Sequence, residues 1–169
     1  ITRTYAGAGD EVLYSEHGFL MYPIAAKAAG ATPVAAPEHN LRADVGALLS
    51  RVSTRTKLVF LANPNNPTGT LIPFAEVRRL RAALRADVIL GLDAAYAEYL
   101  DDSEDGRSLV NEGSNTIVFH TFSKIYGLPA LRLGWAYAPA HIIDVLNRVR
   151  SPFNVTTPAL AAGIAAMKD

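Results

Sequence analysis

The sequence has no cysteine, so disulfide bonds and thiolate metal sites are excluded. This absence fits a reducing compartment, and we predict a cytoplasmic location. The sequence also has no run near the roughly 20 consecutive apolar residues that span a bilayer, and no secretory n-region and h-region. We therefore expect no membrane partner.

The chain has no net charge, because 16 Lys and Arg residues balance 16 Asp and Glu residues. This balance leaves no electrostatic footprint for nucleic acid or for an anionic membrane, so neither is expected as a partner. Neither G-x-G-x-x-G nor a Walker sequence occurs, so a generic nucleotide-binding domain lacks support. No metal site is predicted.

Three short apolar runs dominate what is present, and they lie at residues 57–62 (KLVFLA), 88–92 (VILGL) and 116–122 (TIVFHTF). Each run is continuous rather than alternating, as expected of strands that are buried on both faces of a parallel sheet. Two further runs, at 11–15 and 32–36, resemble strands on either side of a helical pattern.

Helical patterns separate the strand-like runs. The first covers residues 19–30 and is predicted to end at Gly30. The second places Val45, Leu48, Leu49 and Val52 on one apolar stripe. The third has Pro73 in its first turn and its arginines outward. Its predicted inward face consists of Phe74, Val77, Leu80 and Leu84.

With 169 residues, half of them hydrophobic, the chain is long enough for one domain with a core. Strand alternates with helix, so we predict an α/β fold with a mostly parallel sheet and helices on both faces. Residues 101–108 are predicted to form a solvated loop, and residues 150–158 a connection into a final helix.

A polar segment follows each of the three main apolar runs: NPNNPTGT (63–70), DAAYAEY (93–99) and TFSK (121–124). Ligands of open parallel sheets bind outside the carboxyl ends of the strands, so these segments are the candidates for a site.

Lys124 is the candidate nucleophile, because a positioned lysine amine can condense with an aldehyde. Thr121, Ser123 and Arg132 add hydroxyls and a guanidinium suited to phosphate oxygens. Lys124 alone could be an ordinary solvent-facing loop lysine, and each of these residues taken alone is weak evidence for a site.

The other two segments supply a carboxylate, a phenol and an amide. Asp93 could lie beside a ligand cation such as a protonated ring nitrogen, or it could form a turn or a helix cap. Tyr96 could reach the same space. Asn66 could offer an N–H to a ligand oxygen from a stiff turn, or belong to an ordinary loop.

Together these groups match one ligand. An aldehyde, a phosphate, a ring nitrogen and a ring hydroxyl describe pyridoxal 5′-phosphate (PLP), for which a Schiff-base lysine and an aspartate on the pyridine nitrogen are the signature. The set of residues therefore predicts a PLP site.

The three segments, the last extended to TFSKIYGLPALRLGW (121–135), resemble in order the signature segments of the fold-type I PLP-dependent aminotransferases, and most closely those of the histidinol-phosphate aminotransferase family. The upstream segment GDEVLYSEHGFLMYPIAAKAAGA is similar to that family as well, so the resemblance covers nearly the whole chain.

The resemblance implies a role for each candidate residue. Lys124 would carry the cofactor and move a proton, Asp93 would hold the pyridine nitrogen protonated, and Asn66 and Tyr96 would bond the phenolic oxygen. Phe19 would stack on the ring, although a core-facing phenylalanine at a helix start is an equally simple interpretation. The implied phosphate ligands are Thr121, Ser123 and Arg132.

The sequence departs from the family pattern in a few places. Ala94 stands where the family commonly has glutamate. The family's upstream Gly-rich segment and its small C-terminal domain have no counterpart in residues 1–169, so we expect a PLP-binding large domain that is incomplete at both ends. The family also implies a homodimer.

The resemblance predicts an aminotransferase that converts L-histidinol phosphate and 2-oxoglutarate into imidazole acetol phosphate and glutamate, as in histidine biosynthesis. An aromatic amino acid aminotransferase and a phospho-amino-acid decarboxylase of the same fold are alternatives, because fold alone does not decide chemistry. A non-catalytic binding or oligomerisation module is a different class of alternative, against which the presence of Lys124 argues.

Overall fold

The computed structural model describes residues 1–100, 104–113 and 115–169. Of the loop expected at 101–108, residues 101–103 lie outside this description. Arg107 and Ser108 belong to the short helix α5, so the loop prediction is wrong at that end.

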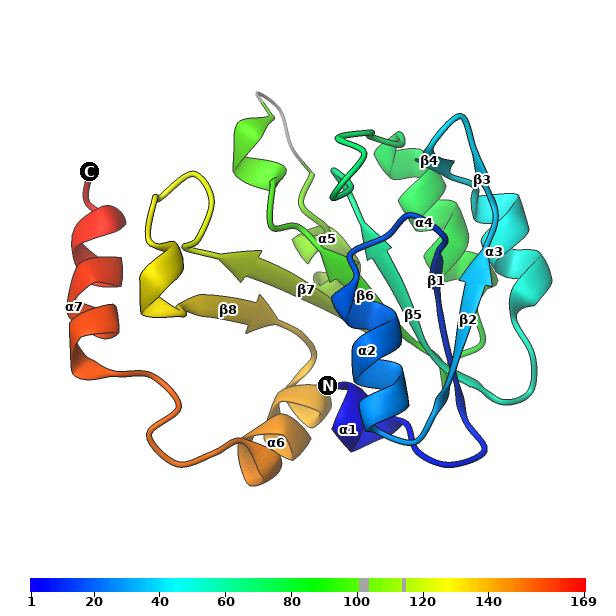
Figure 1. Ribbon diagram of the computed structural model, residues 1–169, viewed down its shortest axis with the longest axis horizontal. Coiled ribbons are helices and arrows are strands. Elements are labelled where there is room, and N and C mark those ends of the chain that lie inside the picture. Colours follow the sequence, from blue (N-terminus) through cyan, green and yellow to red (C-terminus); the bar gives the residue numbers. More distant parts are fainter. Residues whose placement is uncertain (101–103, 114) are drawn as a thin grey trace.

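A six-stranded sheet forms the centre of the fold, with the strand order β2-β1-β5-β6-β7-β8 (Figure 1). Every neighbouring pair from β2 to β7 is parallel, and β8 runs antiparallel to β7. The strands are β1 (Glu11–Ser15), β2 (Thr32–Ala36), β5 (Thr56–Ala62), β6 (Ile89–Asp93), β7 (Thr116–Thr121) and β8 (Gly134–Tyr137). The predicted mostly parallel sheet is confirmed.

Helices cover both faces of the sheet, as predicted. One core cluster joins the sheet to α3, α4 and α5, and a second joins it to α2 and α6. The helices are α1 (Thr2–Tyr5), α2 (Met21–Ala28), α3 (Val45–Arg51), α4 (Phe74–Ala83), α5 (Arg107–Asn111), α6 (Ala140–Val149) and α7 (Thr157–Ala166). The described residues also form two short 3-10 helices, η1 (Ala97–Tyr99) and η2 (Pro129–Leu131). A small antiparallel hairpin consists of β3 (Glu38–His39) and β4 (Arg42–Ala43).

The helix boundaries follow local chemistry. Asp44 caps α3 by accepting a hydrogen bond from the Ala47 N–H at 3.0 Å. Gly30 follows the last residues of α2 with φ +79°, a left-handed conformation that glycine adopts without strain. The sequence predicted Pro73 in the first turn of α4, but Pro73 is the N-cap residue and lies one position before the helix.

The predicted outward direction of the arginines on α4 is wrong for Arg81, which is only 7% exposed. Its guanidinium donates hydrogen bonds to four backbone carbonyls, because the end of α4 and the starts of two strands converge there. The acceptors are the carbonyl oxygens of Val88 (2.7 Å), Arg85 (2.8 Å), Leu84 (3.0 Å) and Asn115 (3.1 Å).

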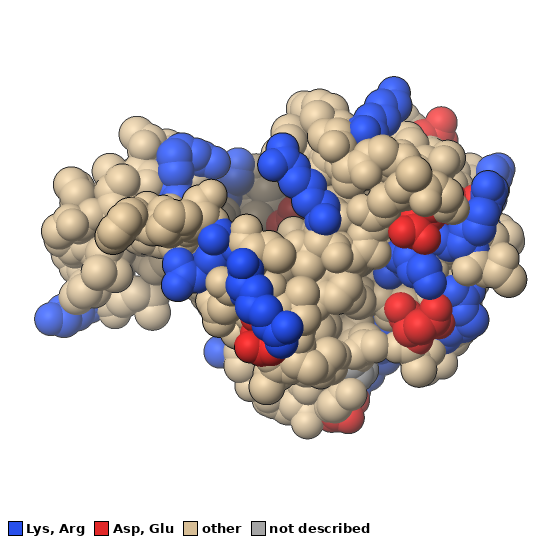
Figure 2. Space-filling model, turned by 90° about the horizontal axis from the view of Figure 1, so that it is seen from below, with Lys and Arg blue, Asp and Glu red and all other residues tan. Residues whose placement is uncertain are grey.

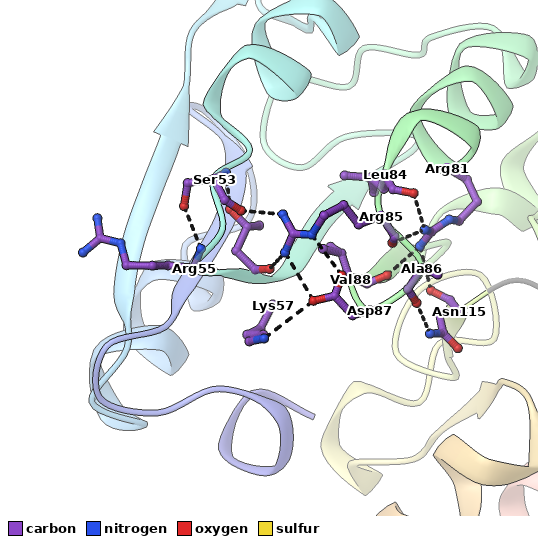
Figure 3. A network of polar contacts seen from close by, with 11 residues as sticks. Ser53, Arg55, Lys57, Arg81, Leu84, Arg85, Ala86, Asp87, Val88 and Asn115 are labelled. Atoms are coloured by element: carbon purple, nitrogen blue, oxygen red, sulfur yellow. Dashed lines mark hydrogen bonds and ion pairs between the residues drawn. The ribbon is translucent and has the colours of Figure 1, made fainter.

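Arg81 belongs to a network at the amino ends of the strands, which we call the amino edge (Figure 3). Arg85 donates to the carbonyls of Ser53 at 2.6 Å and Thr56 at 3.2 Å. Glu11 at the start of β1 accepts from the Ser53 hydroxyl and from the Arg55 guanidinium, both at 2.5 Å. The starts of β1, β5, β6 and β7 are thus tied to one another by side chains.

We expect Arg81→Met to lower the free energy of unfolding by about 3 kcal/mol, because the buried carbonyls would lose a charged donor without gaining water. Chemical denaturation of the full-length protein measures this change. Arg79→Met is the matched control, because Arg79 lies on the exposed side of the same helix and pairs only with Glu76 among the described residues. An equal loss in both variants would contradict the role assigned to Arg81.

Candidate functional site

A cavity of about 360 Å³ opens at the carboxyl ends of β5, β6 and β7. This volume is in the range of small-molecule sites. The structure brings all eight predicted site residues into its wall: Phe19, Asn66, Asp93, Tyr96, Thr121, Ser123, Lys124 and Arg132. They come from four separate segments of the chain.

The three asparagines of the loop after β5 have different contacts. Asn63 exchanges two hydrogen bonds with the backbone of Ile72, at 3.0 and 2.9 Å. The Asn65 side chain donates to the His17 carbonyl at 3.1 Å and to the Thr68 hydroxyl at 2.8 Å. Asn66 lines the cavity. Two of the three amides therefore hold the loop, and the third is available to a ligand.

Hydrogen bonds hold the loop that precedes Phe19 in place. Glu38 accepts hydrogen bonds from the Ser15 hydroxyl at 2.5 Å and from the His17 N–H at 3.0 Å. Together with the contact between Asn65 and the His17 carbonyl, these bonds join the loops after β1 and β5. The backbone that leads to Phe19, which lines the cavity, is therefore fixed on two sides.

Asp93 ends β6 and has both carboxylate oxygens occupied. Oδ2 accepts a hydrogen bond from the Tyr22 hydroxyl at 2.9 Å, and Oδ1 accepts one from the Ala95 N–H at 3.1 Å. Burial raises the pKa of Asp93, while these hydrogen bonds and the nearby His120 and Lys124 act to lower it. A cation bound beside Asp93 would favour the charged carboxylate further.

Lys124 lies in the loop between β7 and η2 and is half-buried. Its Nζ is 4.9 Å from the centre of the Tyr96 ring. The loop is closed by backbone hydrogen bonds from the Gly127 N–H to the Lys124 carbonyl and from the Leu128 N–H to the Phe122 carbonyl, both at 2.9 Å. Backbone hydrogen bonds within the loop therefore fix the position from which the Lys124 side chain reaches the cavity.

Thr121, Ser123 and Arg132 lie close together beside Lys124. The Ser123 N–H donates to the Thr121 hydroxyl at 3.0 Å, and Arg132 Nη1 is 3.5 Å from the Ser123 hydroxyl. Arg132 has a left-handed backbone, with φ 52°, which is uncommon for a residue other than glycine. A guanidinium and hydroxyl donors at one corner of the cavity form a site with the chemistry to hold a phosphate group.

Tyr22 and His120 were not singled out from the sequence. Tyr22 falls inside the apolar pattern of α2, where a core position is the ordinary interpretation. His120 lines the cavity, with Nδ1 2.8 Å from Glu98 and its ring stacked 4.1 Å from Trp135. The polar partner of each residue comes from a distant segment, so no local pattern marks either one.

Charge on the molecular surface is mixed. On the face shown in Figure 2, Lys and Arg side chains lie in separate groups between uncharged residues, and acidic residues adjoin several of them. No helix among the described residues is long and apolar enough to cross a membrane. Within the same residues, no group of three or more His, Asp or Glu side chains is placed to hold a metal ion.

The mostly parallel sheet with helices on both faces matches the structures of the fold-type I aminotransferase class, and its carboxyl edge carries a cavity lined by a lysine. The chain belongs to the aminotransferase class I and II family, whose family model matches residues 1–169.

The chain is also similar in sequence to individual histidinol-phosphate aminotransferases. The chain is 63% identical to the histidinol-phosphate aminotransferase of Paramagnetospirillum magneticum and 58% identical to that of Rhodospirillum centenum. All of this chain aligns in both cases, and it spans 47% of each relative's length.

The solved structure of histidinol-phosphate aminotransferase from Sinorhizobium meliloti in complex with pyridoxal-5′-phosphate is also similar. It superimposes with a TM-score of 0.93 at 31% identity, and the match covers 99% of this chain and 46% of that one.

Proposed function

We propose that this chain forms the PLP-binding large domain of an aminotransferase that moves the amino group of L-histidinol phosphate to 2-oxoglutarate. The products would be imidazole acetol phosphate and glutamate. The observation that carries the proposal is the meeting of Lys124, Asp93 and the Thr121–Ser123–Arg132 corner in one cavity. The names of the two relatives at 63% and 58% identity support the choice of substrate.

The residues in the cavity fit the chemistry of PLP. Lys124 supplies an amine for the aldehyde, and the corner at Arg132 supplies donors for the phosphate. Asp93 supplies a carboxylate for the ring nitrogen, Asn66 and Tyr96 supply donors for the phenolic oxygen, and Phe19 supplies an aromatic face. When bound, PLP would supply an electron sink for the negative charge that develops at the carbon bearing the donor's amino group.

The protein side of the mechanism follows from these positions. Lys124 would act as the base that takes the proton from the substrate Cα and returns a proton during transfer. Asp93, whose two oxygens each accept a hydrogen bond, would hold a proton on the ring nitrogen by its negative charge. Arg132 and Ser123, which lie beside each other, would hold the phosphate of the cofactor and so fix its orientation.

Two further parts of the proposal follow from the family resemblance. We propose that the full-length protein is a homodimer and that it acts in the cytoplasm. Size-exclusion chromatography with light scattering tests the first part, and fractionation of cells tests the second.

The experiment that tests the function uses the full-length protein loaded with PLP and reduced with borohydride. Peptide mass mapping should find a pyridoxyl adduct on Lys124, and the protein should form glutamate from 2-oxoglutarate with L-histidinol phosphate as the donor. Faster glutamate formation with aromatic amino acids would favour the aromatic aminotransferase. Release of carbon dioxide from a phosphorylated amino acid, without glutamate formation, would favour the decarboxylase. The absence of both adduct and turnover would favour the non-catalytic module.

A further inference from the structure

We propose that Tyr22 is a positioning residue for Asp93, and that its hydroxyl orients the carboxylate for the ring nitrogen of the cofactor. This inference rests on the proposed function, because it assigns Asp93 the task described above. Tyr22 itself need not touch the cofactor; it acts through Asp93.

The contact joins two segments that are far apart in the sequence. Tyr22 lies in the first turn of α2, and Asp93 ends β6. The phenol donates to Oδ2 at 2.9 Å while the Ala95 N–H donates to Oδ1 at 3.1 Å. Because each oxygen has its own donor, the carboxylate cannot rotate about its Cβ–Cγ bond without losing both hydrogen bonds. Each oxygen also keeps acceptor capacity for a ligand N–H.

The Tyr22 ring is itself held by packing on several sides, and the side chain is 7% exposed. It stacks on Phe60, with the ring centres 4.8 Å apart and the planes at 4°, and it meets Phe19 edge-on at 6.0 Å. Gly91 makes the Phe60 position possible, because a Cβ atom there would lie 2.7 Å from the Phe60 ring. The hydroxyl is therefore delivered to Asp93 by a rigid aromatic stack.

The electrostatics of the pair agree with this geometry. Burial raises the pKa of Asp93, and the hydrogen bond from Tyr22 opposes that effect by stabilising the charged carboxylate. Burial and the neighbouring Asp93 charge raise the pKa of Tyr22, so the phenol keeps its proton and remains a donor. A bond from a neutral donor to a buried carboxylate is of the charge-assisted kind, roughly twice as strong as one between neutral groups.

A purely structural tyrosine would make the same aromatic contacts, so the test must isolate the hydroxyl. Tyr22→Phe removes only the oxygen and keeps the stack on Phe60. In the full-length protein, titrated with PLP and followed by fluorescence, we expect PLP to bind about tenfold more weakly to this variant. In an Asp93→Asn background the same substitution should change binding less than about twofold, because no charge remains to be positioned.

A second measurement does not depend on the cofactor. The carboxyl carbon of Asp93, followed by NMR in cofactor-free protein, should titrate at a higher pKa in Tyr22→Phe than in the unmodified protein. Tyr137→Phe is the matched control for both measurements, because it removes a tyrosine hydroxyl that donates to Asn111 at 2.6 Å outside the cavity. This control should change neither PLP binding nor the titration.

The outcomes separate the inference from the proposed function. Weaker binding only where Asp93 is present, together with the higher pKa, supports the positioning role. PLP binding within twofold of the unmodified protein, or an unchanged titration, overturns it. An equal loss in the Asp93→Asn background also overturns it, in favour of packing alone. If the unmodified protein binds no PLP, the proposed function fails, and the positioning role fails with it.

Discussion

Replacing Lys124 with alanine is expected to lower turnover of the full-length protein by at least about 10⁴-fold, because one side chain serves as both the covalent anchor and the proton carrier. The rate of glutamate formation measures the loss. The borohydride-trapped adduct should disappear in the same variant, as read by intact mass. The fold should persist, because the loop around Lys124 is closed by backbone hydrogen bonds rather than by its amine.

Lys27→Ala is the matched control for this substitution. Lys27 lies on the exposed side of α2, so its removal should leave both the adduct and the rate unchanged. Persistence of the adduct in Lys124→Ala would place the reactive amine elsewhere and contradict the assignment. Unchanged affinity for a protein partner, with no turnover in either variant, would instead indicate the binding module.

Asp93→Asn is expected to have opposite effects on activity and on stability. Turnover should fall by about 10²–10³-fold, because the neutral amide cannot hold the proton on the ring nitrogen by charge. The cofactor-free protein should melt at a higher temperature at pH 7 than the unmodified protein, because a buried charge is removed. The amide oxygen can still accept from the Ala95 N–H, and the amide nitrogen can donate to the Tyr22 oxygen. Activity and thermal melting of the same sample test both statements.

The contribution of Asp93 to the free energy of unfolding depends on pH, because its pKa differs between the folded and the unfolded protein. The folded-state pKa of Asp93 is raised above its ordinary 3.8, so the native protein binds more protons than the unfolded chain in the window just above that value. The contribution of Asp93 to stability is therefore full below pH 3.8 and is lost as pH rises through the folded pKa. Asp93→Asn should flatten this decline in a series of melting curves.

The control for Asp93→Asn is Asp144→Asn, which removes a carboxylate that pairs with Arg148 on the exposed side of α6. It should alter neither turnover nor the pH profile in this window. A lower melting temperature for Asp93→Asn at pH 7 would show that the charge is stabilised in the folded protein, against the expectation.

The sequence predicted the central strands well because burial on both faces requires continuous apolar runs, and 57–62, 88–92 and 116–122 coincide with β5, β6 and β7 within a residue or two. The eight candidate residues were also found in one cavity, since parallel strands bring their carboxyl ends to the same edge. Their catalytic and binding roles remain predictions.

What the sequence did not disclose depends on contacts between distant segments. The helical pattern of α4 predicts an exposed Arg81, yet its guanidinium is buried and donates hydrogen bonds to backbone carbonyls. Tyr22 follows a core pattern, yet its hydroxyl meets Asp93. Asn63, Asn65 and Asn66 are chemically identical in the sequence, and only the fold assigns two of them to the loop.

The amino edge has a practical consequence for protein engineering. β5 has seven residues, so roughly 20 Å separates the arginine network at its start from the cavity at its end. Substitutions more than about 10 Å apart with no shared partners usually have additive effects. Thermostabilising changes can therefore be collected at the amino edge and combined with changes of substrate preference in the cavity, with each set optimised separately.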